Sequence, residues 1–127
     1  MPVWLALGRE VTATALARGV TPRGFGSFDP MAFAPGRADA DGIKVAEWLR
    51  DYTAVGAKTH SGIWRDLAVR KRKTEAEAQL MIMPRLAVQN GIATPALNAL
   101  GGLIKDIEAG RRKQSAETFN SLLDAIA

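Results

Sequence analysis

Residues 58–83, KTHSGIWRDLAVRKRKTEAEAQLMIM, are the stretch on which the expected fold depends. A polar loop leads to Ser61, a short helical pattern of apolar residues follows, and a basic run then reaches Thr74, where a second helix is expected to begin. Thr74 and Glu77 have the spacing of a capping box, in which hydroxyl and carboxylate each bond a free backbone amide. The stretch therefore predicts two adjacent helix starts, one at Ser61 and one that places Glu75 in a first helical turn.

Ser61 and Glu75 are the candidate ligand-binding residues of this stretch. A serine hydroxyl beside the free amides of a helix start suits an anion. A carboxylate in a first turn is favoured by the helix dipole and can still accept hydrogen bonds from a ligand. Each residue also has a purely structural interpretation, Ser61 as a helix cap and Glu75 as a dipole-offsetting carboxylate.

The basic run and the histidine near Ser61 and Glu75 each have two possible interpretations. The basic run 70–73 either faces a phosphate or carboxylate ligand or is a solvated helix end. Histidine is a common general acid, but no acidic residue stands near His60 in the sequence, which favours a surface loop.

Upstream, residues 4–18 predict an amphipathic helix that stops at Gly19. Glycine, proline and phenylalanine dominate residues 20–37, which predicts a long loop anchored by its phenylalanines. Asp39 or Asp41 is expected to cap the helix that follows.

Downstream, Pro84 is expected to kink or split the second helix of the central stretch. Thr94 and Pro95 predict a helix start with a capping hydroxyl and a proline at the first position. The glycine pair 101–102 indicates close approach by another helix. A last helix is expected to start near Ser115.

Length and composition limit which classes of protein are possible. The 127 residues, 47% hydrophobic and 24% charged, are typical of one folded domain, and helical periodicity without alternating strand segments predicts an all-α domain of about six or seven helices. We expect no membrane span and no leader peptide, and hence a cytoplasmic protein. Without cysteine and with one histidine, a metal site is not expected.

Three segments, in order, resemble the C-terminal helical domain of the ketopantoate reductases, also called 2-dehydropantoate 2-reductases. They are HSGIWRDLAVRKRKTEAEAQ, NGIATPALNAL and IKDIEAGRRK, and the resemblance extends over roughly residues 4–124. No single motif is specific, but their order and spacing together are similar to those of the family. In that family an N-terminal Rossmann domain binds NADPH, and the helical domain closes over it to reduce 2-dehydropantoate to pantoate in pantothenate biosynthesis.

The resemblance implies roles for two residues. Ser61 matches the family's substrate-binding serine. Glu75 matches a glutamate at the cleft of cofactor and substrate, and the resemblance therefore implies that Glu75 is a cofactor-binding residue. Two details differ, since Gly62 rather than Ser61 stands four residues before Asp66, and Glu75 is followed by alanine and glutamate instead of a β-branched residue and aspartate.

The larger differences concern catalysis. The GFG at residues 24–26 lacks the flanking strand and helix of a dinucleotide-binding turn, so the Rossmann domain is expected to be absent. Neither Lys44 nor Lys58 matches the family's catalytic lysine. We therefore expect no catalytic residue, no activity of the chain alone, and NADP bound only with a partner Rossmann domain.

Two other functions remain open. An apolar surface that once met a Rossmann domain would favour a non-catalytic dimerisation domain, and hence a homodimer. The net charge of +4 permits a small nucleic-acid-binding module, but the chain lacks a basic stripe with interleaved aromatic residues, so this alternative is disfavoured.

Overall fold

The computed structural model describes residues 1–56 and 58–127, and these residues form helices joined by turns. The one β feature in this part of the chain is an isolated bridge between Phe25 and Phe28. The predicted all-α class, in a single domain, is confirmed. The elements are α1 (Pro2–Ala17), the 3-10 helix η1 (Pro30–Phe33), α2 (Asp39–Ala54), α3 (Gly62–Arg65), the π-helical turn η2 (Asp66–Arg70), α4 (Ala76–Gln79), α5 (Ile82–Val88), α6 (Pro95–Glu108) and α7 (Ala116–Ile126).

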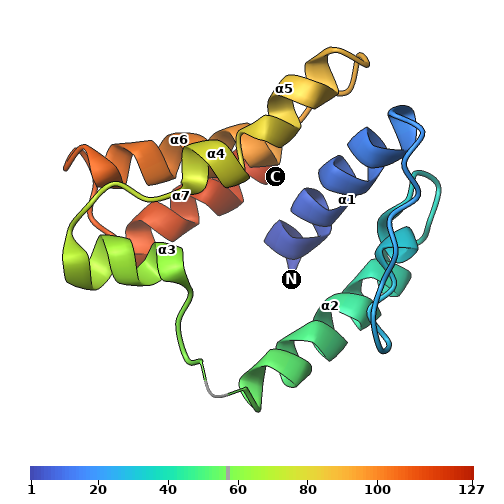
Figure 1. Cartoon of the computed structure of the whole chain (residues 1–127), viewed down its shortest axis with the longest axis horizontal. Coiled ribbons are helices and arrows are strands. Elements are labelled where there is room, and N and C mark those ends of the chain that lie inside the picture. Colours follow the sequence, from blue (N-terminus) through green and yellow to red (C-terminus); the bar gives the residue numbers. More distant parts are fainter. Residues whose placement is uncertain (57) are drawn as a thin grey trace.

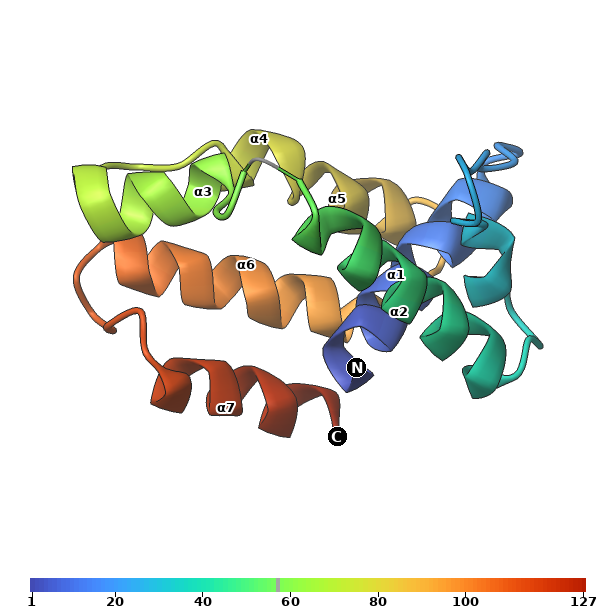
Figure 2. The same ribbon diagram turned by 90° about the horizontal axis from the view of Figure 1, so that it is seen from below.

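Helix α1 joins two groups of elements. It packs on α2 and η1 on one side and on α5, α6 and α7 on the other. Figure 1 shows α3 to α7 together and α2 apart from them, across α1. The segment between η2 and α4 runs back along α3, so α3 and α4 begin at the same end of this group (Figures 1 and 2).

The end of α1 follows its local sequence. Gly19 has a positive φ of 73° and donates its N–H to Leu16 O, while Val20 N–H bonds Ala15 O. Glycine adopts this left-handed conformation without steric cost, and the bonds satisfy carbonyls of the last turn. The predicted stop at Gly19 is confirmed.

The phenylalanines of the following loop anchor it in part. Phe33 is buried in the core, and Phe28 packs against the same cluster. Phe25 is 51% exposed and sets its ring edge-on to Trp48, with centroids 5.9 Å apart. Core anchoring is thus correct for Phe28 and Phe33 but not for Phe25.

The predicted cap of α2 is wrong. Ala38 is the N-cap residue, and no side chain bonds the first amides. Asp39 and Asp41 lie within the first turn, where Asp39 pairs with Arg9 and Asp41 Oδ2 lies 3.3 Å from Arg37 Nη2. Both carboxylates still face the positive end of the helix dipole.

The capping box at Thr74 is also wrong. The helix begins at Ala76 with Glu75 as N-cap, so Glu75 precedes the first turn. Glu77 turns away from the cap and pairs with Arg85 and with Lys105, whose Nζ is 2.8 Å from Glu77 Oε2. The hydrogen bond from Lys105 is the largest cause of a lowered pKa of Glu77.

A carboxylate from a distant helix takes the place of Glu77. Glu108 Oε1 accepts from Thr74 N–H at 2.7 Å and from Thr74 Oγ1 at 2.5 Å, and Thr74 Oγ1 accepts from Ala76 N–H at 3.1 Å. The end of α6 is thereby fixed to the start of α4.

The start of α6 has a similar arrangement. Pro95 occupies the first helical position as predicted, but the Thr94 hydroxyl does not cap the helix. Instead, the Glu10 carboxylate accepts from Ala96 N–H at 2.7 Å and from Leu97 N–H at 2.8 Å. Helix α1 therefore caps α6 from 86 residues away in the chain.

The prediction at Pro84 is confirmed, and the prediction at the glycine pair is confirmed for one of the two glycines. The helical segment is split, with α4 ending at Gln79 and α5 starting at Ile82, so that Pro84 lies in a first turn. A Cβ on Gly101 would lie 2.1 Å from Met81 Sδ, whereas nothing lies within 4 Å of one on Gly102. Close approach is therefore real at Gly101, and a methionine side chain makes it.

The last helix begins where expected. Ser115 caps α7 by accepting from Thr118 N–H at 3.3 Å. Leu122 is buried, whereas Phe119 is 52% exposed. Among the described helices, none combines the length and the apolar character needed to cross a bilayer.

Candidate functional site

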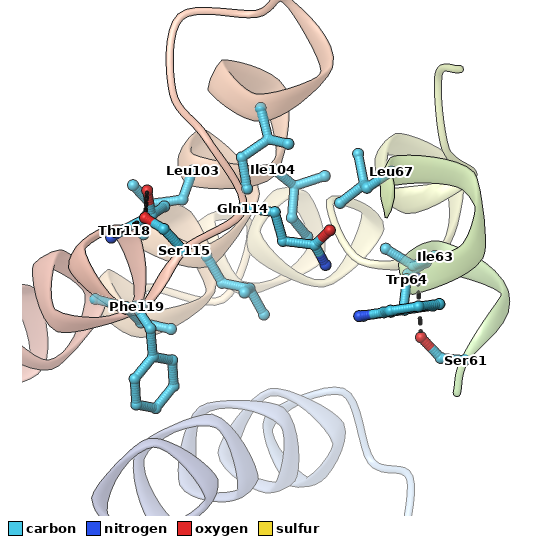
Figure 3. Close-up of a pocket in the computed structure, with 13 residues that line it drawn as sticks. Ser61, Ile63, Trp64, Leu67, Leu103, Ile104, Gln114, Ser115, Thr118 and Phe119 are labelled. Carbon is cyan, nitrogen blue, oxygen red and sulfur yellow. Dashed lines mark hydrogen bonds between the residues drawn. The ribbon is translucent and has the colours of Figure 1, made fainter. Parts of the chain in front are cut away.

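Ser61 begins α3 as the sequence predicts. Its backbone is extended, with φ −71° and ψ 164°, and its Oγ accepts from Trp64 N–H at 3.1 Å. Figure 3 shows this hydrogen bond at the edge of a cavity. Because a hydroxyl both donates and accepts, Ser61 retains its O–H for a ligand while it caps the helix.

Glu75 begins α4. Its side chain is exposed, and its Oε2 accepts from Gln79 Nε2 at 2.5 Å. A carboxylate has about four acceptor positions, so Glu75 can accept further hydrogen bonds.

Ser61 and Glu75 line one cavity of about 340 Å³, which we call the polar cavity. It lies between α3 with η2 and the segment that leads into α4, because that segment runs back along α3 (Figures 1 and 2). The structure thus brings together the two residues that the sequence analysis singled out. The lining residues are Ser61, Gly62, Ile63, Asp66, Arg70, Arg72, Glu75 and Gln79.

A carboxylate with two arginines forms one wall of the polar cavity. Asp66 is buried, and its Oδ1 accepts from Arg70 Nη1 at 3.0 Å and from Arg72 Nε at 2.8 Å. The hydrogen bonds from Arg70 and then Arg72 hold the pKa of Asp66 below its usual range. With Glu75 included, the lining carries two positive and two negative charges.

The sequence analysis did not predict this group of three residues. Asp66 and Arg70 have the i,i+4 spacing of a helical ion pair, which was a usable signal. No sequence signal predicted that Arg72 would approach Asp66, because the approach depends on a turn. Lys71 is left-handed, with φ 51°, and this turn lets Arg72 N–H bond Asp66 O at 3.0 Å.

A second cavity, of about 330 Å³, meets the first at Ser61 and is mainly apolar. Ile63, Trp64 and Leu67 line it on one side, and side chains of α6 and α7 line the other (Figure 3). In the same view Phe119 points toward α1. This second cavity therefore lies between α3 and the pair α6 and α7.

His60 lies beside the site and not within the polar cavity. Its exposed ring stacks on Trp64 with centroids 3.7 Å apart, and its Nδ1 lies 3.0 Å from Thr59 Oγ1. Since neither neighbour is acidic, nothing here orients His60 as a general acid.

Several basic residues are paired with carboxylates within the chain. Arg111 and Arg112 both contact Asp106, at 2.6 and 3.6 Å, as Arg70 and Arg72 contact Asp66. No group of three or more potential metal ligands occurs in the ranges 1–56 and 58–127.

Comparisons of the chain with models of protein families, with curated proteins and with solved structures found no match.

Proposed function

We propose that the chain is the helical, substrate-closing half of an NADPH-dependent 2-oxo acid reductase that converts 2-dehydropantoate to pantoate. NADP would be held by a Rossmann domain, on the same polypeptide or on another chain. Like the family it resembles, the protein is proposed to act in the cytoplasm.

The observation that carries this proposal is the position of Ser61 and Glu75 in one cavity. These residues stand 14 positions apart in the sequence and begin two different helices. Their shared location in the polar cavity is what a substrate serine and a cleft glutamate require. In the proposed role, Ser61 donates its hydroxyl hydrogen to an oxygen of the substrate, and Glu75 accepts a hydrogen bond from the opposite side.

Exposed aromatic side chains support the proposal that the chain binds a partner. Trp4 is 45% exposed and Phe119 52%, both on helices that contact each other. Large aromatic side chains left in water favour association, because each buries a large apolar area when covered.

The direct test adds a Rossmann domain to the chain. The chain is mixed with the separated Rossmann domain of a ketopantoate reductase, and oxidation of NADPH by 2-dehydropantoate is followed by absorbance. We expect turnover in the mixture and none with the chain alone. Absence of turnover with several such domains, each shown to bind NADPH, would refute the proposal.

A matched pair of variants separates ligand contact from helix capping. Ser61→Ala removes a cap and a cavity hydroxyl, whereas Ser115→Ala removes the cap of α7, which is outside the polar cavity. Both should lower stability by about 1 kcal/mol. Only Ser61→Ala should raise KM or lower kcat in the mixture.

A non-catalytic dimerisation domain is the second candidate, favoured by an apolar groove of about 400 Å³ beside Trp4 and Val11. In a homodimer this groove would be covered by a second copy. Sedimentation over a range of concentrations tests it, and a monomer at every concentration would rule it out.

A further inference from the structure

We propose that Arg72 is the carboxylate-binding residue of the polar cavity, and that the cavity takes a small carboxylate with a hydrogen-bond donor at its other end. This inference rests on the proposed function in placing the ligand there. It adds a residue to which the family resemblance assigns no role.

The first reason is that Asp66 fixes Arg72 twice. The carbonyl of Asp66 accepts from Arg72 N–H at 3.0 Å, and its carboxylate accepts from Arg72 Nε at 2.8 Å. Arg72 is therefore held in place before a ligand arrives, which reduces the entropy lost on binding. The Arg72 side chain is 60% exposed, but its Nε is held by the buried carboxylate of Asp66.

The second reason is that Arg72 still has donors to offer. Asp66 binds Arg72 through Nε, and among the described residues no side chain or carbonyl bonds its two terminal nitrogens. The planar guanidinium presents such donors as a fork that matches the two oxygens of a carboxylate. Arg70, bound through Nη1, has one of these nitrogens occupied.

The third reason is the charge at the other end of the cavity. Ser61 and Asp66 are five residues apart along a helical segment, a rise of roughly 7 Å. Glu75 precedes α4, which begins at the Ser61 end, and its carboxylate accepts from the neutral Gln79. A ligand with a carboxylate at both ends would face repulsion from Glu75, whereas a hydroxyl or ammonium group there would donate to it.

The test measures binding of four small probes to the full 127-residue chain by calorimetry and by backbone amide shifts: butyrate, 4-hydroxybutyrate, 4-aminobutyrate and butylammonium. We expect both substituted acids to bind roughly tenfold more tightly than butyrate, the equivalent of one good hydrogen bond to a charged group. Their order tells whether the preferred donor is a hydroxyl or an ammonium. Butylammonium should bind most weakly, because it lacks the carboxylate.

Variants of Arg72 and Glu75 test which residue binds each end of the ligand. Arg72→Gln should weaken the three carboxylates roughly tenfold or more, and Glu75→Gln should weaken only the two that carry a donor. Arg111→Gln is the matched control, because Arg111 also pairs with an aspartate through Nε but lies outside the cavity. Arg72→Lys keeps a positive charge beside Asp66 and lacks the fork, so it should fold normally and still bind carboxylates weakly.

Three results would overturn the inference: no binding of any carboxylate, equal effects of Arg72→Gln and Arg111→Gln, or full affinity in a folded Arg72→Lys protein. Its failure is distinguishable from that of the proposed function. If carboxylate binding depends on Arg72 but the mixture shows no turnover, the proposed reductase function is refuted and the role of Arg72 is retained. If the mixture turns over equally well with Arg72→Gln, the role of Arg72 is refuted and the proposed reductase function is retained.

Discussion

The carboxylate of Glu108 accepts hydrogen bonds from both the backbone N–H and the hydroxyl of Thr74, 34 residues earlier. Thr74 is buried, so both of its donors would lack a partner without Glu108. This contact fixes the segment that carries Arg72 and Glu75 to the end of α6. The shape of the polar cavity therefore depends on a residue that does not line it.

Replacing this carboxylate should destabilise the protein. We expect Glu108→Ala to lower the free energy of unfolding by about 1–3 kcal/mol, because two buried donors lose a charged acceptor. Urea unfolding measures the change. Glu47→Ala, an exposed substitution on α2, should shift the midpoint little, and equal shifts for the two variants would contradict the structural role of Glu108.

The cap that Glu10 provides should be local to α6. Glu10→Ala leaves Ala96 N–H and Leu97 N–H without their acceptor, so we expect a loss of about 1–2 kcal/mol. Hydrogen exchange at these two amides should accelerate more than exchange in the middle of α2. Unchanged protection at the start of α6 would show that the cap is not formed in solution.

The two glycines of α6 should respond differently to alanine. Gly102→Ala should stabilise the helix by up to about 1 kcal/mol, since nothing lies near the added methyl. Gly101→Ala has the same helix preference but must displace Met81, so it should be clearly less stable than Gly102→Ala. In a Met81→Ala background, the difference in unfolding midpoint between the two should shrink; a constant difference would point to another cause.

Asp66 should contribute to the pH dependence of stability. Its pKa is lowered in the folded state, so its contribution is fully present above the unfolded pKa of about 4 and is lost as pH falls through the lower folded value. The difference in stability between wild type and Asp66→Asn should be largest near neutral pH and should decline in acid. Urea midpoints across that range test this, with the exposed Asp124→Asn as control. A difference independent of pH would exclude the charge of Asp66 as its source.

Part of the candidate site could be predicted from local sequence. Ser61 caps a helix through an amide three residues away, so its position depends on its neighbours alone. The prediction that Glu75 lies in a first helical turn was wrong by one position, because Glu75 is the N-cap of α4. Arg72 could not be assigned, because its orientation depends on the left-handed Lys71 and on Asp66.

The helical class and most helix boundaries could be predicted from local sequence patterns. The stop at Gly19 and the start at Pro95 follow from backbone preferences that act within one or two turns. The carboxylates that bond the turn before α4 and the first amides of α6 could not be predicted, because they come from distant helices. Glu10 and Glu108 act across 86 and 34 residues, and a hydrogen bond over such a separation exists only after packing has brought the two helices together.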